Sequence, residues 1–343
     1  MRQENKINLS IIIPAYNEEN YISALFGQLK LYFNYKNIEI IFINDGSIDN
    51  SKNILQSFKN NNDYIFEYDF IDIKKNSGKG KAIQLGLEKS QGNYVLFLDA
   101  DLELDTKDAF DMYQMIQDKK EIKCIFGSRY LTGKLKKNNY FFNSLVGKIN
   151  SLIFNIFFLQ SLTDVHCGLK IIHRDVLKKI QITVNDFGIE LDLASQIVRN
   201  NFFIYEYGVS YYFRTKLQGK KISWLDGLKS LYYLFKIRFV DNNKYTNLSL
   251  IFSIVYMSYV GSYFGMGLGN TIFILIFGII GSIIGLNFLI IPSSLIFLFI
   301  YIGSLFGQGN GKTISVTIFF CFGIIFARYI KKYLSKSKIY SWF

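Results

Sequence analysis

An apolar run that ends in two carboxylates limits what this chain can fold into and bind. The stretch 94–98 is β-forming, and Asp99 and Asp101 follow it directly. Such a run is typical of a buried parallel strand, and ligands of open α/β sheets bind at the carboxyl ends of strands. Because residues i and i+2 of an extended chain point the same way, the two carboxylates are expected to share one hard cation with substrate phosphates. The run predicts a nucleotide diphosphate site with Mg²⁺ or Mn²⁺; a solvated strand end is the alternative.

Strands alternate with helical patterns over the first hundred residues. Further strands are predicted at three stretches, 7–13, 38–43 and within 64–73. The segment 74–81 is basic and glycine-rich and precedes a helix predicted at 82–90, so its backbone is suited to cradle phosphate. This segment matches neither the Walker pattern nor the dinucleotide fingerprint. The alternation predicts an α/β fold with a doubly wound, mostly parallel sheet.

The composition changes near residue 245. No charged side chain occurs from Thr246 to Gly311, and a charge at mid-helix costs about 2.5–3.5 kcal/mol on insertion scales. The segment 246–332 is therefore predicted to be an all-α transmembrane domain of four helices, with two spans plus re-entrant segments as the alternative. Basic residues flank it on both sides, so we expect an even number of crossings with both termini in the cytoplasm.

The part before residue 245 is expected to be a cytoplasmic domain, because the segment 1–6 lacks the apolar core of a signal peptide. The net charge of +12 indicates the anionic face of a membrane rather than nucleic acid, because no segment resembles a recognition helix or an RNA platform. The three cysteines are far apart and form no Cys-x-x-Cys, so neither a disulfide nor a zinc site is predicted. His166 and His173 are interpreted as structural.

Four motifs resemble glycosyltransferase family 2, which has the GT-A fold. They begin at Ser10, Asn44, Asn76 and Asp99 and read Ser-Ile-Ile-Ile-Pro-Ala-Tyr-Asn-Glu-Glu, Asn-Asp-Gly-Ser, Asn-Ser-Gly-Lys-Gly-Lys-Ala and Asp-Ala-Asp. The resemblance implies a nucleotide-binding set, namely Pro14, Ala15, Tyr16, Asn17, Glu18, Asp45, Lys79 and Asp99. It also implies that Asp101, assisted by Asp99, binds Mg²⁺ or Mn²⁺. The second motif usually reads Asp-Asp-Gly-Ser, so no role is assigned to Asn44.

Later motifs resemble the polyprenyl-phosphate sugar synthases, the group of dolichol-phosphate mannosyltransferase and dolichyl-phosphate glucosyltransferase. They lie at five places, 127–130, 163–164, 188–190, 209–222 and 226–227. In this resemblance, Arg129 and Arg214 face the lipid phosphate, and Lys220 and Lys221 are further candidates to bind it. A guanidinium can meet a phosphate with two parallel hydrogen bonds. A surface ion pair is the alternative for each of these cations.

These parts predict the organisation of the chain. A cytoplasmic GT-A domain covers 1–215 and includes an apolar interface helix near 145–159, and a basic amphipathic interface helix covers 216–245. Packing against the sheet is the alternative for both helices. The transmembrane domain at 246–332 precedes a basic cytoplasmic tail at 333–343. We therefore expect an integral membrane protein, most simply of a prokaryotic plasma membrane.

The predicted reaction is the inverting transfer of a hexose from GDP-mannose or UDP-glucose to a polyprenyl phosphate, undecaprenyl or dolichyl, at the cytoplasmic membrane face. The catalytic candidates are Asp99, Asp101, Arg129 and Arg214. The acceptor phosphate has its second pKa near ~6, so it is largely dianionic at neutral pH and needs cations to hold it rather than a general base.

Two alternatives stay open. In the first, a membrane glycosyltransferase acts on a hydroxyl group of a glycolipid or polysaccharide, and Glu190 or Asp192 supplies the base that a hydroxyl needs. In the second, the protein binds or transports a lipid-linked sugar without catalysis. The partners predicted from the sequence are a nucleotide sugar, a polyprenyl phosphate and membrane lipid; a homo-oligomer stays open.

Overall fold

The computed structural model describes eight ranges of the chain: 7–60, 63–131, 133–134, 136–137, 141–186, 188–215, 218–220 and 224–240. The predicted transmembrane domain at 246–332 and the predicted tail at 333–343 lie outside them. The chain divides into two compact units. The first comprises Met1–Asn155 and Gln160–Leu234, and the second comprises Ile156–Leu159 and Phe235–Phe343. The main sheet lies in the first unit.

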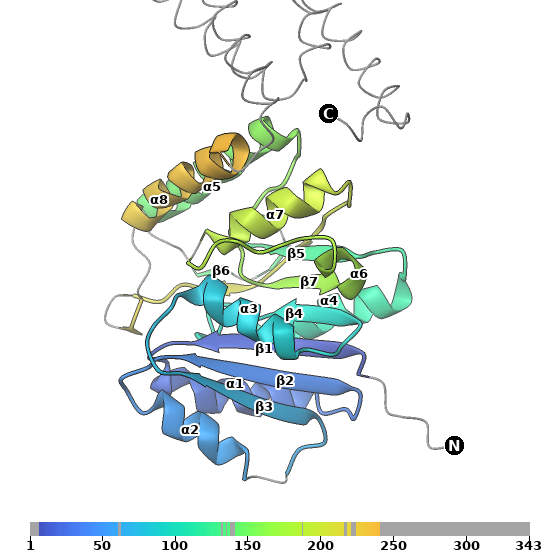
Figure 1. Ribbon diagram of the computed structural model, residues 1–343, viewed down its shortest axis with the longest axis vertical. Helices are drawn as coiled ribbons and strands as arrows, with labels where there is room; N and C mark the ends of the chain where they lie inside the picture. The colour runs from blue at the N-terminus through green and yellow to red at the C-terminus, as the bar shows by residue number, and fades with distance from the viewer. Residues whose placement is uncertain are drawn as a thin grey trace, which may run out of the picture. The chain divides into compact units, whose positions relative to one another are not determined.

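Four parallel strands form the first half of the main sheet (Figure 1). They are β1 (Leu9–Ala15), β2 (Ile38–Asp45), β3 (Glu67–Ile73) and β4 (Tyr94–Phe97). Every residue of β2 is buried, as expected for a parallel strand covered on both faces. The predicted strands are thereby confirmed, although β4 ends at Phe97 and does not extend through the aspartates.

The second half of the sheet is mixed. It contains β5 (Cys124–Ser128), β7 (Lys170–His173) and β8 (Tyr205–Gly208), and the complete order is β3-β2-β1-β4-β7-β5-β8. Strand β7 runs antiparallel to both β4 and β5, whereas β8 is parallel to β5. The predicted mostly parallel α/β sheet is confirmed. A second, two-stranded sheet pairs β6 (Lys136–Lys137) with β9 (Tyr211–Tyr212).

Helices alternate with the strands, and the last two helical elements follow the final strand. The helical elements are α1 (Glu19–Tyr32), α2 (Ser51–Phe58), α3 (Lys79–Lys89), α4 (Thr106–Asp118), α5 (Phe141–Phe158), α6 (Arg174–Leu177), α7 (Ile189–Arg199), α8 (Trp224–Phe235) and the π-helical turn η2 (Lys236–Val240). Helix α3 begins three residues before the helix predicted at 82–90. Its first residue, Lys79, therefore lies at the helix N-terminus beside the glycine-rich turn.

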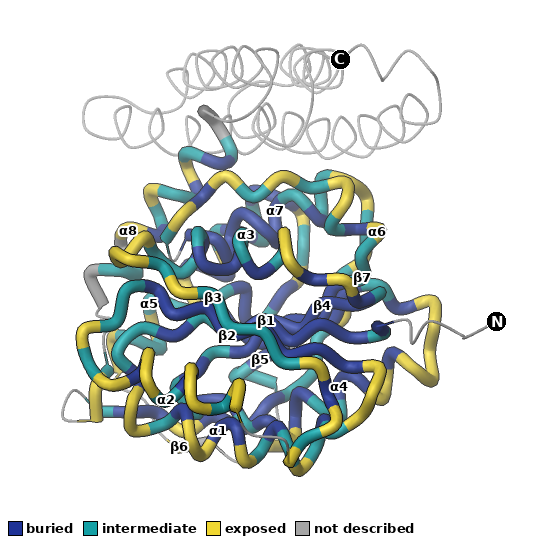
Figure 2. The backbone as a smooth tube through the Cα atoms, turned by 60° about the horizontal axis from the view of Figure 1, so that its bottom comes forward, coloured by how far each residue is buried: buried dark blue, intermediate teal, exposed yellow. Residues whose placement is uncertain are grey.

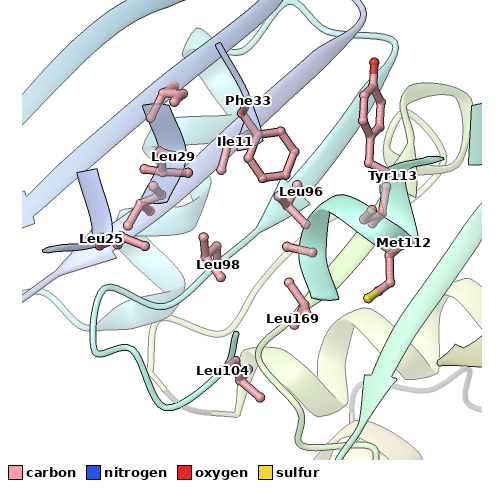
Figure 3. Packing of buried hydrophobic residues seen from close by; sticks show 14 of the residues in the cluster. Ile11, Leu25, Leu29, Phe33, Leu96, Leu98, Leu104, Met112, Tyr113 and Leu169 are labelled. Atoms are coloured by element: carbon pink, nitrogen blue, oxygen red, sulfur yellow. The ribbon is translucent and has the colours of Figure 1, made fainter. Parts of the chain in front are cut away.

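Neighbouring residues of β1 point to opposite faces of the sheet and contact different helices. Ile11 packs in one cluster with Leu29 of α1 and Met112 of α4 (Figure 3). Ile12 lies on the other face against α3, where a Cβ on Gly86 would come within 2.6 Å of Ile12 Cγ2. The central strands are buried between these layers (Figure 2). This packing fixes the strands whose carboxyl ends carry the candidate site.

Helices α5 and α8 lie side by side (Figure 1). Their close approach requires a glycine, because a Cβ on Gly227 of α8 would come within 2.3 Å of Val146 Cγ1 of α5. Among the described residues, α5 is the one helix long and apolar enough to cross a membrane by length and composition, a criterion that core helices also satisfy. Its side chains Phe141 and Leu152 are exposed. Its predicted place in a membrane interface stays a prediction.

Candidate functional site

A pocket of about 460 Å³ lies at the carboxyl ends of the central strands. The site residues predicted from the sequence that line it are Pro14, Ala15, Tyr16, Glu18, Asp45, Lys79, Asp99, Asp101, Arg129, Arg214 and Lys220. Asn17 is not among the lining residues. Its side-chain Oδ1 accepts a hydrogen bond of 2.9 Å from the backbone N of Ile48 and so joins two loops. Lys221 lies outside the described residues.

The two aspartates after β4 engage different cations of the protein. Asp99 Oδ1 lies 2.7 Å from Lys79 Nζ, and Asp101 Oδ2 lies 2.9 Å from Arg214 Nη2. The expectation that both carboxylates project alike from an extended strand is wrong. The strand ends two residues before Asp99, and Leu102 has a positive φ of 54°. The chain turns at this point, so the two carboxylates line the same pocket with different partners.

Arg214 binds the acidic wall of the pocket. Its Nη1 donates to Glu18 Oε2 at 2.8 Å, its Nη2 donates to Asp101 Oδ2 at 2.9 Å, and its backbone N donates to Glu103 Oε1 at 3.1 Å. Burial raises the pKa of Asp101 to about 7, and the charges of Asp99 and Glu103 add to this rise. Arg214 therefore offsets repulsion within this wall, and its predicted contact with a lipid phosphate stays a prediction.

Lys79 joins the pocket to a buried ion-pair network. Its Nζ lies 2.7 Å from Asp99 Oδ1 and 2.8 Å from Glu190 Oε1. The other carboxylate oxygen of Glu190 pairs with Lys170, which is fully buried. Burial alone would raise the pKa of Glu190, but Lys170 and Lys79 outweigh it and lower this pKa to about 2. A general base works best with a pKa near the operating pH, so Glu190 is suited to hold Lys79 rather than to accept a proton.

Asp192, the alternative candidate for the base that a hydroxyl acceptor needs, is not among the pocket-lining residues. Its carboxylate accepts hydrogen bonds from the backbone N of Thr183 at 2.9 Å and from Gln196 Nε2 at 2.7 Å. Both donors are neutral, and Asp192 is buried. The carboxylate thus ties the segment before α7 to the helix.

Asp45 and Asn44 have structural partners at the end of β2. Asp45 accepts hydrogen bonds from the backbone N of Ser77 at 2.8 Å and of Gly78 at 2.9 Å, which positions the turn before α3. Asn44 Nδ2 donates to Asp72 Oδ1 at 2.7 Å, and these two residues are register partners on β2 and β3. An aspartate at position 44 would face Asp72 as a like charge, which is destabilising. The amide at position 44 avoids this repulsion and donates a hydrogen bond instead.

Two cations of the pocket lining contact Tyr211. Arg129 is held by the buried Asp164 through Nε at 2.6 Å and Nη2 at 2.8 Å, and its guanidinium carbon lies 5.3 Å from the centre of the Tyr211 ring. Lys220 Nζ lies 3.2 Å from Tyr211 Oη and 2.8 Å from Glu103 Oε2. Asp164 thus occupies one edge of the Arg129 guanidinium group. Arg129 and Lys220 both line the pocket, where Lys220 is paired with Glu103.

The sequence reasoning missed Glu103, Tyr211 and Asn150, which also line this pocket. A signal was present for Glu103, because it continues the alternation of acids that begins at Asp99. The other two contribute through tertiary contacts that no local spacing indicates.

The donor set fits a divalent cation bound together with a diphosphate. Asp99 and Asp101 supply carboxylate oxygens in one pocket, and the described residues contain no cluster of three or more potential metal ligands. Mg²⁺ typically binds one or two carboxylates and takes its remaining ligands from substrate phosphates and water. A two-carboxylate site of this kind suits a cation that arrives with a nucleotide diphosphate.

The family of the chain follows from its sequence. Residues 10–181 match Glycosyl transferase family 2, and the chain belongs to this family. The poly-beta-1,6-N-acetyl-D-glucosamine synthase of Staphylococcus aureus strain MSSA476 is 29% identical over 144 residues, which are 42% of this chain and 32% of that protein. The synthase of the same name from Staphylococcus epidermidis strain RP62A is 27% identical over 201 residues, 54% of this chain and 48% of that protein. The matches thus span a third to a half of these relatives.

A solved structure shares the fold. Glucosyl-3-phosphoglycerate synthase from Mycobacterium tuberculosis, in complex with Mn²⁺ and UDP-glucose, matches with a TM-score of 0.53 at 14% identity. The match covers 67% of this chain and 78% of that one. This likeness supports the predicted GT-A fold. At 14% identity it supports the fold alone and says nothing about the substrates of this chain. The finer resemblance to polyprenyl-phosphate sugar synthases stays a prediction.

Proposed function

We propose that this chain is a metal-dependent glycosyltransferase that moves a hexose from GDP-mannose or UDP-glucose to a polyprenyl phosphate at the cytoplasmic membrane face, with inversion. The observation that carries the proposal is that one pocket is lined by the two carboxylates after β4 and by two further cations that meet beside Tyr211. The carboxylates are those of Asp99 and Asp101, and the cations are Arg129 and Lys220. The carboxylates suit a cation with a diphosphate, and Arg129 and Lys220 suit an anionic acceptor.

The donor side follows from the strand ends and the turn before α3. A divalent cation at Asp99 and Asp101 would offset the negative charge of the departing diphosphate. Lys79 lies at the N-terminus of α3, where backbone N–H groups and the helix dipole favour phosphate. Asp45 holds the turn that brings Lys79 into the pocket. These residues bind and orient the nucleotide sugar.

The acceptor side supports a phosphate over a hydroxyl group. A phosphate monoester is already ionised near neutral pH and needs cations to place it. Arg129 is preorganised by Asp164, so little conformational freedom is lost when its remaining N–H groups meet an anion. Lys170 and Lys79 lower the pKa of Glu190 to about 2, which makes it a weak base for a hydroxyl group.

A hydroxyl acceptor is the second candidate, because the Staphylococcus relatives are named as polysaccharide synthases. One experiment separates the two candidates. Full-length protein in detergent with Mn²⁺ is given UDP-glucose or GDP-mannose carrying a radiolabelled sugar, together with undecaprenyl phosphate, dolichyl phosphate or a free oligosaccharide. We expect at least one of the two donors to transfer its labelled sugar to a lipid phosphate. No labelled lipid is expected in EDTA. Label in the oligosaccharide alone would contradict the proposal.

Arg129→Ala is expected to raise the KM for polyprenyl phosphate about 10-fold or more and to leave the KM for the donor within about twofold. A charge-assisted hydrogen bond contributes about 1.5–3 kcal/mol, and 1.4 kcal/mol is tenfold. Steady-state kinetics with each substrate varied in turn measures this.

Because Arg129→Ala also leaves the buried Asp164 without its partner, Arg129→Lys serves as a second variant that retains the charge. Lys107→Ala, on the outer surface of α4, is the control. If Arg129→Lys and Arg129→Ala both fold and both show the wild-type KM for the lipid phosphate, Arg129 does not belong to the acceptor site.

A further inference from the structure

The side chain of Asn150 is fixed on one side and unpaired on the other. It is 1% exposed and lies on α5 in the pocket lining. Its Nδ2 lies 3.1 Å from the backbone O of Gly227 on α8 and 3.1 Å from His166 Nε2. Among the described residues, its Oδ1 has no hydrogen-bond partner. Buried side-chain acceptors are nearly always paired, so an unpaired one in a pocket requires an explanation.

The orientation of the Asn150 amide follows from its partners. Because a backbone carbonyl only accepts hydrogen bonds, the atom that faces Gly227 O must be the amide nitrogen. The same nitrogen then donates to His166 Nε2, so the proton of that ring lies on Nδ1. Burial lowers the pKa of His166 to about 4, and the ring is neutral at physiological pH. Exchanging the amide atoms would place two acceptors together, so Oδ1 stays the free group.

An unpaired carbonyl oxygen selects the chemistry of its ligand. It repels the phosphates of a nucleotide or of a lipid acceptor, because they are acceptors themselves. It binds a hydroxyl or N–H group. Donor hexoses present hydroxyl groups, and the hexose is attached directly to the diphosphate that Asp99 and Lys79 are suited to hold.

The chain around His166 leads back to the diphosphate side of the pocket. Two residues further on, a Cβ on Gly168 would come within 2.2 Å of Asp99 Oδ2 and 3.1 Å of Lys79 Nζ. Because Gly168 has no side chain, the segment 166–168 passes directly beside Asp99, one of the two predicted metal ligands. A hexose on a diphosphate bound there lies in the same pocket as Asn150.

We propose that Asn150 Oδ1 accepts a hydrogen bond from one hydroxyl group of the donor hexose, so that Asn150 determines which sugar the enzyme selects. Gly227 and His166 hold the amide in the orientation that this requires. The inference rests on the donor half of the proposed function and does not depend on the acceptor. Two buried contacts preorganise the group, so little freedom is lost when the sugar binds.

The test measures donor binding without any acceptor. Full-length protein in detergent with Mn²⁺ is titrated with UDP-glucose, GDP-mannose and their 2-, 3-, 4- and 6-deoxy analogues. For wild type we expect one deoxy analogue to bind about 10-fold or more weakly than its parent, because that analogue leaves Oδ1 unpaired. Asn150→Ala is expected to bind the same two compounds within about twofold of each other.

Asn155→Ala is the matched control, because Asn155 lies on the same helix and has both amide atoms paired with the backbone of Leu162. It should keep the wild-type discrimination even if it lowers the melting temperature. Equal deoxy-to-parent ratios in wild type and Asn150→Ala would overturn the inference. The inference would also be overturned if the deoxy-to-parent ratio differed between wild type and Asn150→Ala only after a hydroxyl acceptor was added. In that case Asn150 Oδ1 would bind a group of the acceptor and not of the donor hexose. If the enzyme does not transfer sugar to a lipid phosphate, the proposed acceptor is wrong. The deoxy-to-parent ratios for donor binding are measured without an acceptor and do not depend on that result.

Discussion

Asp101→Asn is expected to lower sugar transfer at least about 100-fold while the protein still folds. The substitution removes one negative charge from the predicted cation site, and removal of a single group that stabilises developing charge typically costs 10²- to 10³-fold in rate. The fold is retained because the side chain is partly exposed and keeps its shape, and because Arg214 still pairs with Glu18 at 2.8 Å. Transfer rate and melting temperature, measured with and without added Mn²⁺, check both halves of this expectation.

Asp111→Asn is the matched control for this result. Asp111 lies on α4, pairs with Lys107 at 2.9 Å and does not line the pocket. It should transfer sugar at the wild-type rate. Wild-type activity should also disappear in EDTA and return with Mn²⁺ or Mg²⁺. An Asp101→Asn protein with near-normal, metal-dependent turnover would place the cation elsewhere.

The sequence predicted the sheet because its strands carry strong local signals. β1, β2 and β4 are mostly apolar, and a polar or glycine-rich turn follows each of them. Parallel strands bring their carboxyl ends to one edge of a sheet. The positions of Asp45 and Asp99 near one pocket could therefore be inferred without knowing any contact.

The ion pairs of the pocket could not be inferred in this way, because they join segments far apart in the chain. Glu190 follows a glycine at the start of α7, and the sequence indicates only an acid near a helix N-terminus. Its partner Lys170 is the first residue of β7, where full burial is unexpected for a lysine. Likewise, Asn44 gained a meaning only when strand register placed Asp72 opposite it. Local pattern thus located the site, and tertiary pairing decided what each acid in it can do.

Glu190→Gln is expected to lower the free energy of unfolding by about 3 kcal/mol near neutral pH, the cost typical of removing one partner from a buried ion pair. Lys170 is fully buried and would lose its carboxylate partner, keeping the backbone O of Cys167 and the face of the Phe126 ring, neither of which carries a negative charge. Asp192→Asn is the matched control, two residues away on the same helix. Its donors are neutral and bind different oxygens of the carboxylate, and the amide keeps one of these two acceptors, so about 1–2 kcal/mol is expected.

The pH dependence of stability identifies the cause of this loss. The pKa of Glu190 is lowered from 4.5 to about 2 on folding, against the effect of burial, by Lys170 and Lys79. A lowered carboxyl pKa contributes stability that is fully present above the unfolded value and is lost as the pH falls toward the folded value. The difference in melting temperature between wild type and Glu190→Gln should therefore stay constant above about pH 5 and narrow below about pH 4.5. Thermal melts of full-length protein in detergent from pH 3 to 8 measure it. A difference that widens toward acid pH would mean that folding raises the pKa of Glu190 and would contradict this account. A Glu190→Gln protein as stable as wild type but without activity would favour Glu190 as a proton acceptor and hence the hydroxyl acceptor.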